Sequence, residues 1–314
     1  MSLLIKKPGI LTTIQDLGRT GHRALGINPS GVMDRAAAIL VNTLLGNPED
    51  EAVLELHFPA GEFIFESRCS FAIGGADFGA ALSGKEIPNW KTVTATKGDV
   101  LKFTAPRRGS RAYLSVAGVF RVDDWLGSKS TNLTANVGGF HGRKLDKDDR
   151  IKFADPHVVT LRGLGPSLIP RYSRFPTVRV IAGAEFDILT AKSEQELLGE
   201  TFTLTNDLNR MGYRLKGPQL FLLHEKEMVS AAVTFGTVQL LPDGQLIVLM
   251  ADHQTSGGYP RIANVIDVDL PLLAQLSAGD SVSFHLVTIE EAEEAKIQFE
   301  HELAFLRTGL SFQR

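Results

Sequence analysis

Most apolar residues of this chain lie in short runs that are rich in β-branched and aromatic side chains, and many of these runs alternate with polar residues. Gly, Pro, Asp and Asn stand at their borders, which is typical of strands that end in turns. Many short strands at close spacing predict antiparallel sheets that form barrels or sandwiches. The predicted strands are 53–58, 62–66, 70–75, 99–104, 111–118, 158–163, 178–183, 201–205, 246–251 and 281–287.

Three segments, 97–103, 147–153 and 278–284, repeat one pattern of residues. Each has a turn that contains Asp, followed by an apolar residue two positions before a Phe. The pattern predicts a turn that starts a strand with one inward face. It is equally compatible with three unrelated hairpins.

Helical periodicity is present in three places. After Ser30, a plausible N-cap, apolar residues recur at the spacing of one helix face until Gly46 and Pro48 end the pattern. A shorter helix is expected after Asp269. The apolar positions of the first helix are Ala37, Leu40, Val41, Leu44 and Leu45.

The third predicted helix is C-terminal. Thr288 and Glu291 have the spacing of a capping box, in which each side chain bonds the backbone N–H of the other residue. The predicted buried stripe is Ile289, Ala292, Phe299, Leu303 and Leu306.

A domain boundary is expected in the segment 163–176, where Pro166, Pro170 and Pro176 discourage regular structure. The predicted domains are a β-rich N-terminal domain over 1–168 and a C-terminal β-barrel over 169–314, the latter including the C-terminal helix. A long ordered connection within one domain is the alternative.

Composition narrows the classes of protein. With 43% hydrophobic and 22% charged residues the chain is typical of globular proteins, and its net charge of -3 gives no basic excess for a nucleic acid or an anionic membrane. No apolar run is long enough to cross a bilayer, and no secretory signal is expected at the N-terminus. Cys69 is the only cysteine, which excludes an internal disulfide and favours a cytoplasmic location.

Several catalytic motifs are absent. Residues 79–86 resemble a phosphate-binding loop, but Glu86 stands where Ser or Thr should bind magnesium, and Pro88 opposes a following helix. A β-hairpin is therefore predicted there. The histidines have no paired spacing, so no metal site is expected, and no G-x-S-x-G motif is present.

Two regions are rich in polar residues and glycine. Region 11–35 contains His22, Asn28 and Ser30 beside four glycines and ends at a predicted helix N-terminus, where amides can hold an anion or a carbonyl oxygen. The alternative is a loop whose side chains satisfy its own backbone.

The second region is 240–263, in which a predicted buried strand runs directly into ADHQTSGGYP. Polar side chains that follow a buried strand are held rigidly, so Asp252 or His253 is a candidate for proton transfer and Tyr259 for orienting a carbonyl. In the alternative, Asp252 and Thr255 cap the turn and Tyr259 packs on it.

Two arginines lie between these regions. Arg210 and Arg214 are four residues apart around Gly212 and can grip a carboxylate or phosphate through paired N–H groups. Surface salt bridges are the alternative for either arginine alone.

Segments 9–55, 111–120, 126–131, 209–217, 235–266 and 269–284 resemble, in order, the family of 5-oxoprolinase C subunits, also called allophanate hydrolase subunit 2-like. The most specific motif is D-x-Q-T-x-G-G-Y-P over Asp252–Pro260. The chain departs from the family pattern at Lys129, where Arg is expected, and at Asp148, where Gly is usual.

The resemblance implies a mainly β fold of two cyclophilin-like β-barrel domains with a few peripheral helices. It implies an enzyme that works with 5-oxoprolinase subunits A and B to open 5-oxoproline to L-glutamate with ATP hydrolysis. No tightly bound cofactor is expected, biotin is not attached to this chain, and the chain alone is expected to be inactive. The module also resembles the carboxyltransferase part of urea carboxylase and an antagonist of a kinase inhibitor, so carboxyl transfer and regulatory binding remain alternatives.

The residue roles that follow are hypotheses. Arg210 binds an anionic group, Asp252 orients or moves a proton, and Tyr259 with the amides of Gly257 and Gly258 stabilises oxyanion charge. The roles require that the Asp-Gln-Thr bend and the Arg-Met-Gly segment meet at a solvent-reachable hollow. The candidate substrate-binding residues are His22, Asn28, Ser30, Arg214, Gln254, Thr255, Gly257 and Gly258.

Overall fold

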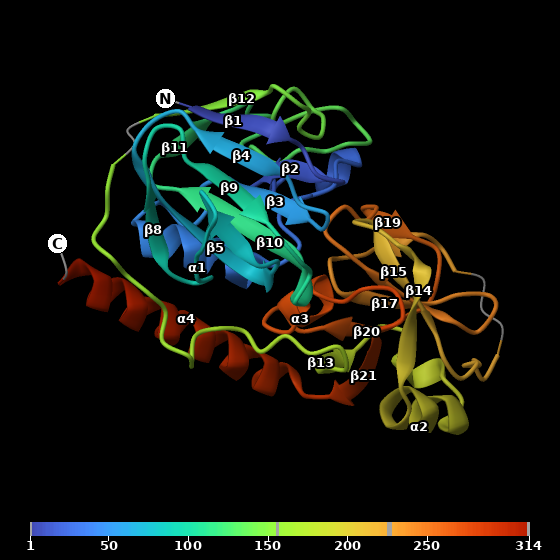
Figure 1. Ribbon diagram of the computed structural model, residues 1–314. Helices are drawn as coiled ribbons and strands as arrows, with labels where there is room; N and C mark the ends of the chain where they lie inside the picture. Colours follow the sequence, from blue (N-terminus) through green and yellow to red (C-terminus); the bar gives the residue numbers. More distant parts are fainter. Residues whose placement is uncertain (1, 155–156, 225–227, 313–314) are drawn as a thin grey trace. The chain divides into compact units, whose positions relative to one another are not determined.

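The computed structural model describes residues 2–154, 157–224 and 228–312 and confirms the mainly β fold (Figure 1). Contacts between Cα atoms divide the chain into two compact units. Unit 1 takes the chain up to Arg19, Ser30–Arg171 and the chain from His301, and unit 2 takes Thr20–Pro29 and Tyr172–Glu300.

Unit 1 contains two antiparallel sheets. The seven-stranded sheet has the order β11-β12-β1-β4-β9-β6-β7, and the five-stranded sheet has the order β2-β3-β10-β5-β8. The first sheet comprises β1 (Ser2–Lys7), β4 (Glu62–Phe65), β6 (Ala80–Leu82), β7 (Lys85–Glu86), β9 (Val100–Phe103), β11 (Val119–Arg121) and β12 (Arg150–Ala154). The second comprises β2 (Thr12–Gln15), β3 (Val53–His57), β5 (Cys69–Asp77), β8 (Thr92–Ala95) and β10 (Arg108–Val116).

One hydrophobic core joins the two sheets of unit 1. Alternate residues of each strand enter it, as the period of two requires. Phe65 of β4 and Phe71 of β5 meet there with ring centroids 4.8 Å apart. The predicted hairpin over 79–86 is confirmed, because β6 and β7 pair through a turn at Ser83 and Gly84.

Helix α1 (Arg35–Leu45) packs on β5 and β10 of the five-stranded sheet (Figure 1). A Cβ atom at Gly74 would lie 2.6 Å from both Val41 and Trp90, so only glycine permits this packing. Gly46 ends the helix at φ 72°, as predicted. The N-cap is Asp34 and not Ser30, because the Asp34 carboxylate accepts the amide of Ala37 at 2.9 Å.

The prediction of a strand over 158–163 is wrong. This segment runs beside the edge strand β8, but the side chain of Thr92 replaces part of the ladder. The Thr92 amide donates to the Arg162 carbonyl at 2.9 Å, and the Arg162 amide donates to Thr92 Oγ1 at 2.8 Å. The alternating sequence reflects a covered sheet edge, which has the same polar and apolar pattern as a strand.

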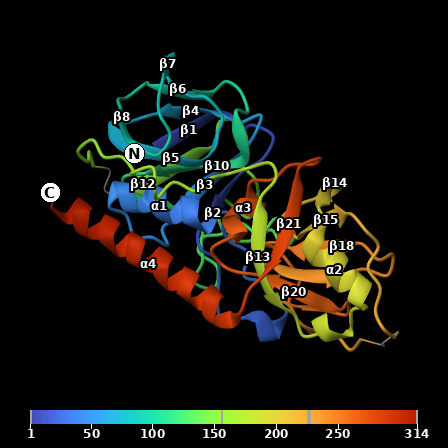
Figure 2. The same cartoon turned by 90° about the horizontal axis from the view of Figure 1, so that it is seen from below.

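Unit 2 is a closed barrel in the order β13-β20-β17-β18-β15-β14-β21, with a parallel pair of β13 and β21 closing it (Figure 2). A separate two-stranded sheet pairs β16 (Ala231–Ala232) with β19 (Ser256–Gly257). The barrel strands are β13 (Thr177–Ala182), β14 (Phe202–Leu208), β15 (Gly212–Lys216), β17 (Thr237–Leu240), β18 (Leu246–Leu249), β20 (Arg261–Val265) and β21 (Ser281–Leu286). The short helices are η1 (Arg23–Leu25), η2 (Phe186–Ile188), α2 (Ala191–Gly199) and α3 (Leu270–Ala274).

Helix α4 (Ile289–Ser311) begins with the predicted capping box. The Thr288 amide donates to the Glu291 carboxylate at 2.8 Å, and the Glu291 amide donates to Thr288 Oγ1 at 3.2 Å. Of the predicted stripe, Leu303 is buried and Ile289 is exposed. The capping box is therefore confirmed, and the predicted buried stripe is wrong at Ile289.

The three repeated segments form one kind of turn, in both units. Asp99, Asp149 and Asp280 each accept the backbone amide three residues earlier, at 2.7, 2.7 and 2.9 Å. The residue before each Asp is left-handed, with φ 95° at Gly98, 69° at Asp148 and 84° at Gly279. Asp148 thus occupies a conformation that favours glycine.

The division into units differs from the predicted domains 1–168 and 169–314 at three places. Residues 20–29 group with unit 2, because Arg23 and Asn28 donate to backbone carbonyls of that unit. The end of the C-terminal helix, from His301, groups with unit 1, where Arg307 pairs with Glu49. The main boundary between the two units lies between Arg171 and Tyr172, three residues after the predicted boundary at 168.

Candidate functional site

Two polar clusters carry the motifs singled out in the sequence, one in each unit. The cluster in unit 1 centres on Asp16, which directly follows the buried strand β2. Its Oδ1 accepts the Gly18 amide at 2.8 Å and the hydroxyls of Ser128 and Ser130 at 2.7 and 2.5 Å. Its Oδ2 accepts the Lys129 amide at 2.6 Å. A buried carboxylate with this set of neutral donors holds the two loops together.

Lys129 and Arg19 extend this cluster. The Lys129 ammonium lies 2.8 and 3.0 Å from the two carboxylate oxygens of the buried Glu51. The guanidinium of Arg19 donates to the Ser130 carbonyl at 2.6 Å and lies 4.9 Å from the ring centroid of Trp125. Both cations of the cluster are therefore engaged within unit 1.

Ser30 belongs to the same unit and is buried. Its hydroxyl lies 3.5 Å from the Thr131 carbonyl, and its own backbone is left-handed at φ 55°. These contacts favour a role for Ser30 in the shape of the loop.

The cluster in unit 2 centres on an ion pair between Arg210 and Asp252. Arg210 Nε and Nη2 lie 2.8 and 3.0 Å from the two carboxylate oxygens of Asp252. The Asp252 amide also donates to the Arg210 carbonyl at 2.7 Å, and the Met250 amide to the Met211 carbonyl at 3.0 Å. The Asp-Gln-Thr bend and the Arg-Met-Gly segment thus meet, and Arg210 is only 7% exposed.

The loop Thr20–Pro29 is attached to this cluster. The side-chain amide of Asn28 donates to the Asp252 carbonyl at 2.9 Å, and the Arg23 guanidinium donates to the Val233 carbonyl. His22 lies one residue before Arg23 and is partly buried. Polar residues from three separate stretches of sequence therefore surround the bend.

His253 is the buried titratable group of the bend. Its Nδ1 lies 2.5 Å from the Gln254 carbonyl, so Nδ1 carries the proton and donates, and Nε2 has the lone pair. Burial lowers the pKa of His253, and the nearby Arg23 lowers it further. His253 is therefore neutral at neutral pH and has the protonation state of a general base.

Tyr259 and Gly258 line a cavity of about 800 Å³ in unit 2. Tyr259 is 44% exposed, whereas Gly257 is tied into the pair of β19 with β16. Asp243, the ion-pair partner of Arg214, lines the same cavity. The other lining residues are Gln219, Leu220, Phe221, Leu222, Met228, Leu240, Leu241, Pro242, Gly244 and Pro260.

The predicted site residues thus fall into three groups. Arg210 and Asn28 each donate to Asp252, the first to its carboxylate and the second to its carbonyl. Tyr259 and Gly258 line the cavity. Arg214 is not in the lining but pairs with Asp243, which is. Ser30 lies in unit 1.

The bend presents its remaining residues differently. Gln254 is exposed, and the Thr255 carbonyl accepts the Val233 amide at 3.3 Å. Neither Arg210 nor Asp252 lines the cavity, and Asp252 occupies the position of the anion expected beside Arg210. The contact of the two segments is a buried ion pair within unit 2.

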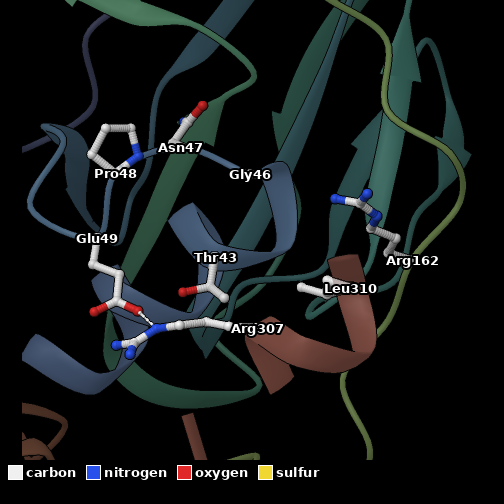
Figure 3. Close-up of a pocket in the computed structure, with 8 residues that line it drawn as sticks. All are labelled: Thr43, Gly46, Asn47, Pro48, Glu49, Arg162, Arg307 and Leu310. Atoms are coloured by element: carbon white, nitrogen blue, oxygen red, sulfur yellow. Dashed lines mark hydrogen bonds and ion pairs between the residues drawn. The ribbon is translucent and has the colours of Figure 1, made fainter. Parts of the chain in front are cut away.

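A second cavity, of about 490 Å³, lies in unit 1 at the C-terminal end of α1 (Figure 3). Figure 3 shows Arg307 paired with Glu49 across it. Arg162 donates to the Leu44 carbonyl at 3.3 Å and so caps the helix. No predicted site residue lines this cavity, and its contacts attach the end of α4 to unit 1.

Glu51 and Ser128 have structural roles that the sequence did not indicate. Glu51 is 78 residues from Lys129 in the chain, and Ser128 is 112 residues from Asp16. No local spacing marks such partners.

Among the residues that the structure describes, no three His, Cys, Asp or Glu side chains gather as metal ligands, and no helix is long and apolar enough to cross a membrane.

Comparison with known proteins agrees with this organisation. Residues 25–286 match the family "Carboxyltransferase domain, subdomain A and B". Among the 5-oxoprolinase C subunits, that of Haemophilus influenzae is 38% identical over 291 residues, covering 93% of this chain and 92% of that protein. The chain belongs to the carboxyltransferase A and B domain family, within which it groups with the 5-oxoprolinase C subunits.

Two further proteins are similar to this chain over nearly its whole length. The counterpart among the 5-oxoprolinase C subunits in Escherichia coli strain K12 is 34% identical over 294 residues and covers 94% of both chains. The crystal structure of the K. lactis urea amidolyase superposes with a TM-score of 0.91 at 24% identity, over 97% of this chain. This chain spans 20% of that much longer protein, and the likeness shows the shared fold.

Proposed function

We propose that this chain is one of the 5-oxoprolinase C subunits, which open the lactam of 5-oxoproline to L-glutamate together with subunits A and B. The observation that supports it most is the similarity to two 5-oxoprolinase C subunits over more than nine-tenths of each chain. Similarity over the whole length favours a shared role in a complex of the same composition.

ATP hydrolysis by the complex is the second part of the proposal. A lactam is a poor electrophile, so its opening needs an activated intermediate or a coupled reaction. The segment that resembles a phosphate-binding loop is the hairpin of β6 and β7 and does not lead into a helix. We assign ATP to the partner subunits and expect the chain alone to be inactive.

The proposed substrate site is the cavity beside Tyr259. The Tyr259 hydroxyl and the Gly258 amide are donors at its lining and are assigned to the developing oxyanion. Arg214 pairs with Asp243, which lines the cavity, but its side chain is 39% exposed, so its remaining N–H groups are assigned to the substrate carboxylate. Asp252 and Arg210 neutralise each other, so we assign them to positioning the bend that carries Gln254–Tyr259.

The experiment is to measure glutamate release from 5-oxoproline by this chain alone and with purified subunits A and B, with and without ATP. Turnover is expected only with all three subunits and ATP. Turnover by the chain alone, or an A–B pair that is fully active without it, contradicts the proposal.

Tyr259→Phe tests the assigned site within the active complex. Loss of one donor to an oxyanion lowers kcat about 10²-fold. Tyr172→Phe, a partly buried tyrosine of the same unit outside the cavity, is the matched control and is expected to keep wild-type kcat.

Carboxyl transfer is the second candidate, favoured by the matched family and by the likeness to the urea amidolyase fold. In that case the chain transfers a carboxyl group from the carboxybiotin of a separate carrier to the nitrogen of an amide substrate, and free biotin stays on the carrier. Carboxylation of urea or a related amide in the presence of a biotin carboxylase and a carrier, without 5-oxoproline turnover, would establish it in place of the first.

A further inference from the structure

The outer face of the seven-stranded sheet in unit 1 concentrates positive charge, although the chain as a whole has a net charge of -3. We call the outward side chains of β11, β12, β1, β4 and β9 the cationic face; Figure 1 shows β12, β1 and β4 side by side. Its cations are Lys6, Lys7, Lys102, Arg121, Arg150 and Lys152, and its carboxylates are Glu62 and Glu66, directly after β4.

Both carboxylates of the cationic face are already neutralised. Glu62 lies 2.6 Å from Lys7, 3.5 Å from Lys102 and 3.8 Å from Lys6. Glu66 lies 3.2 Å from Arg150 and accepts the Ser2 hydroxyl. The pKa of each carboxyl is held below its usual range, first by the hydrogen bond from Lys7 or from Ser2, so both are charged at neutral pH. The excess charge of the face remains positive.

Arg121 and Lys152 are directly opposite each other in the register of β11 and β12, and both are exposed. Like charges at directly opposite positions destabilise an antiparallel pair. Cations on an edge strand also prevent aggregation, which is a sufficient reason for Arg121 on β11. It is no reason for Lys6 and Lys102, which lie on inner strands of the sheet.

A half-buried apolar row crosses the middle of the same face. Leu4 of β1 is opposite Ile64 of β4, and Ile64 is opposite Val100 of β9. Arg150 is opposite Leu4 on the other side and extends the row toward Lys152. An apolar centre with a charged, solvated rim is the anatomy of a protein–protein interface.

We propose that the cationic face is the surface through which this chain binds a partner subunit, and that the partner presents an acidic surface with an apolar centre. This inference rests on the proposed function, which requires partner subunits, and adds the surface that receives one of them. Charge complementarity accelerates association and selects the partner, while the row of Leu4, Ile64 and Val100 gives the contact that excludes water. A nucleic acid is disfavoured because its backbone offers no counterpart to the apolar row.

The test is charge reversal at the pair that has no carboxylate beside it. Arg121→Glu with Lys152→Glu leaves the pairs of Glu62 and Glu66 intact. The affinity for purified subunits A and B, measured by calorimetry at 50 and 300 mM salt, is expected to fall at least tenfold at low salt and by less at high salt, because salt screens exposed charges. The melting temperature is measured in parallel to show that the variant folds.

Lys91→Glu with Lys192→Glu reverses two exposed cations outside the cationic face and is the matched control, expected to bind as wild type does. If the wild-type chain binds a subunit and the reversed face binds equally well, the inference is overturned while the proposed function stands. If the wild-type chain binds neither subunit and adds nothing to glutamate release, both are overturned. Binding of a 20-base-pair DNA duplex that the reversal abolishes, with subunit binding unchanged, replaces the protein partner with a nucleic acid.

Discussion

Asp16 in unit 1 and Asp252 in unit 2 have the same place in the sequence pattern but different partners. Each follows a buried strand, β2 or β18, inside a polar segment rich in glycine. The Asp16 carboxylate accepts hydrogen bonds from two hydroxyls and two backbone amides, all of which are uncharged. Asp252 receives a guanidinium.

The difference decides what each carboxylate does. A carboxylate held by neutral donors is sensitive to the number and direction of those donors, so Asp16 acts as a clamp between loops. A buried carboxylate held by a cation is sensitive to the charge of its partner, and removal of the cation leaves an uncompensated charge. Loop shape in unit 1 is therefore expected to depend on Asp16, and the position of the bend in unit 2 on the Arg210–Asp252 pair.

The largest expected effect is that of Arg210→Met. It leaves Asp252, whose side chain is only 14% exposed, without its cation, which costs about 3–5 kcal/mol of unfolding free energy in comparable buried pairs. Arg214→Met removes a half-exposed partner of the solvated Asp243 and is expected to cost much less, because solvent screens the pair. Urea unfolding of both variants measures the contrast, and equal losses would show that the Asp252 pair is no more than a surface salt bridge.

Asp16→Asn is expected to have the next largest effect. An amide keeps one acceptor oxygen, so either the Lys129 amide or the Gly18 amide with the two hydroxyls loses its acceptor. The expected cost is about 1.5–3 kcal/mol, as for hydrogen bonds to charged groups. Asp124→Asn, at an exposed carboxylate that accepts the Gly127 amide at 3.0 Å, is the control. A loss at Asp16 that does not exceed the control's would end the distinction between the two carboxylates.

The pH dependence of the free energy of unfolding tests the cluster in unit 2 with both carboxylates intact, because His253 belongs to that cluster. Burial lowers the pKa of His253 in the folded chain below the unfolded value of about 6.5. Above that pH the histidine is neutral in both states, and the stability that depends on its neutral form is fully present. As the pH falls from about 6.5 toward the lower folded pKa, the unfolded chain takes up a proton first and stability is lost. The urea midpoint measured from pH 7.5 to 5 should show this loss, and His253→Gln should remove it.

His285→Gln, at an exposed histidine on β21, is the control for this dependence and should keep the wild-type pH profile. A His253→Gln profile that overlays the wild-type profile would show that another group titrates in this range.

The smallest effect tests the feature in which the two units are alike. Asp148 is left-handed in a turn where its counterparts are Gly98 and Gly279, so Asp148→Gly is expected to stabilise by about 0.5–1 kcal/mol. Gly279→Asp should destabilise unit 2 by a similar amount. Thermal unfolding measures both, and a destabilised Asp148→Gly would mean that the aspartate has a contact stronger than its backbone strain.

Much of the fold could be predicted because it depends on local periodicity. The alternation in β3, β4 and β10 and the capping box of α4 are properties of neighbouring residues, and their elements appear close to the expected positions. The covered edge at 158–163 could not be distinguished from a strand, because the difference is whether Thr92 bonds through its side chain.

The candidate site was predictable only as a set of residue types. The motif from Asp252 to Pro260 was visible, and so was the Arg210 segment, but nothing local indicated that the two would neutralise each other. The inward direction of His253 and the outward direction of Tyr259, six residues later, depend on the path of the backbone after β18.

The sequence by itself determined the mainly β fold, the C-terminal end of α1, the start of α4, the repeated Asp turn and membership of the family, because each depends on neighbouring residues or on collinear motifs. Only the tertiary structure decided that Asp16 is held by hydroxyls and amides and Asp252 by a guanidinium. It also brought six cations onto one sheet face. Charge interactions depend on distance and burial, and residues 42 or 112 positions apart acquire both only when the chain folds.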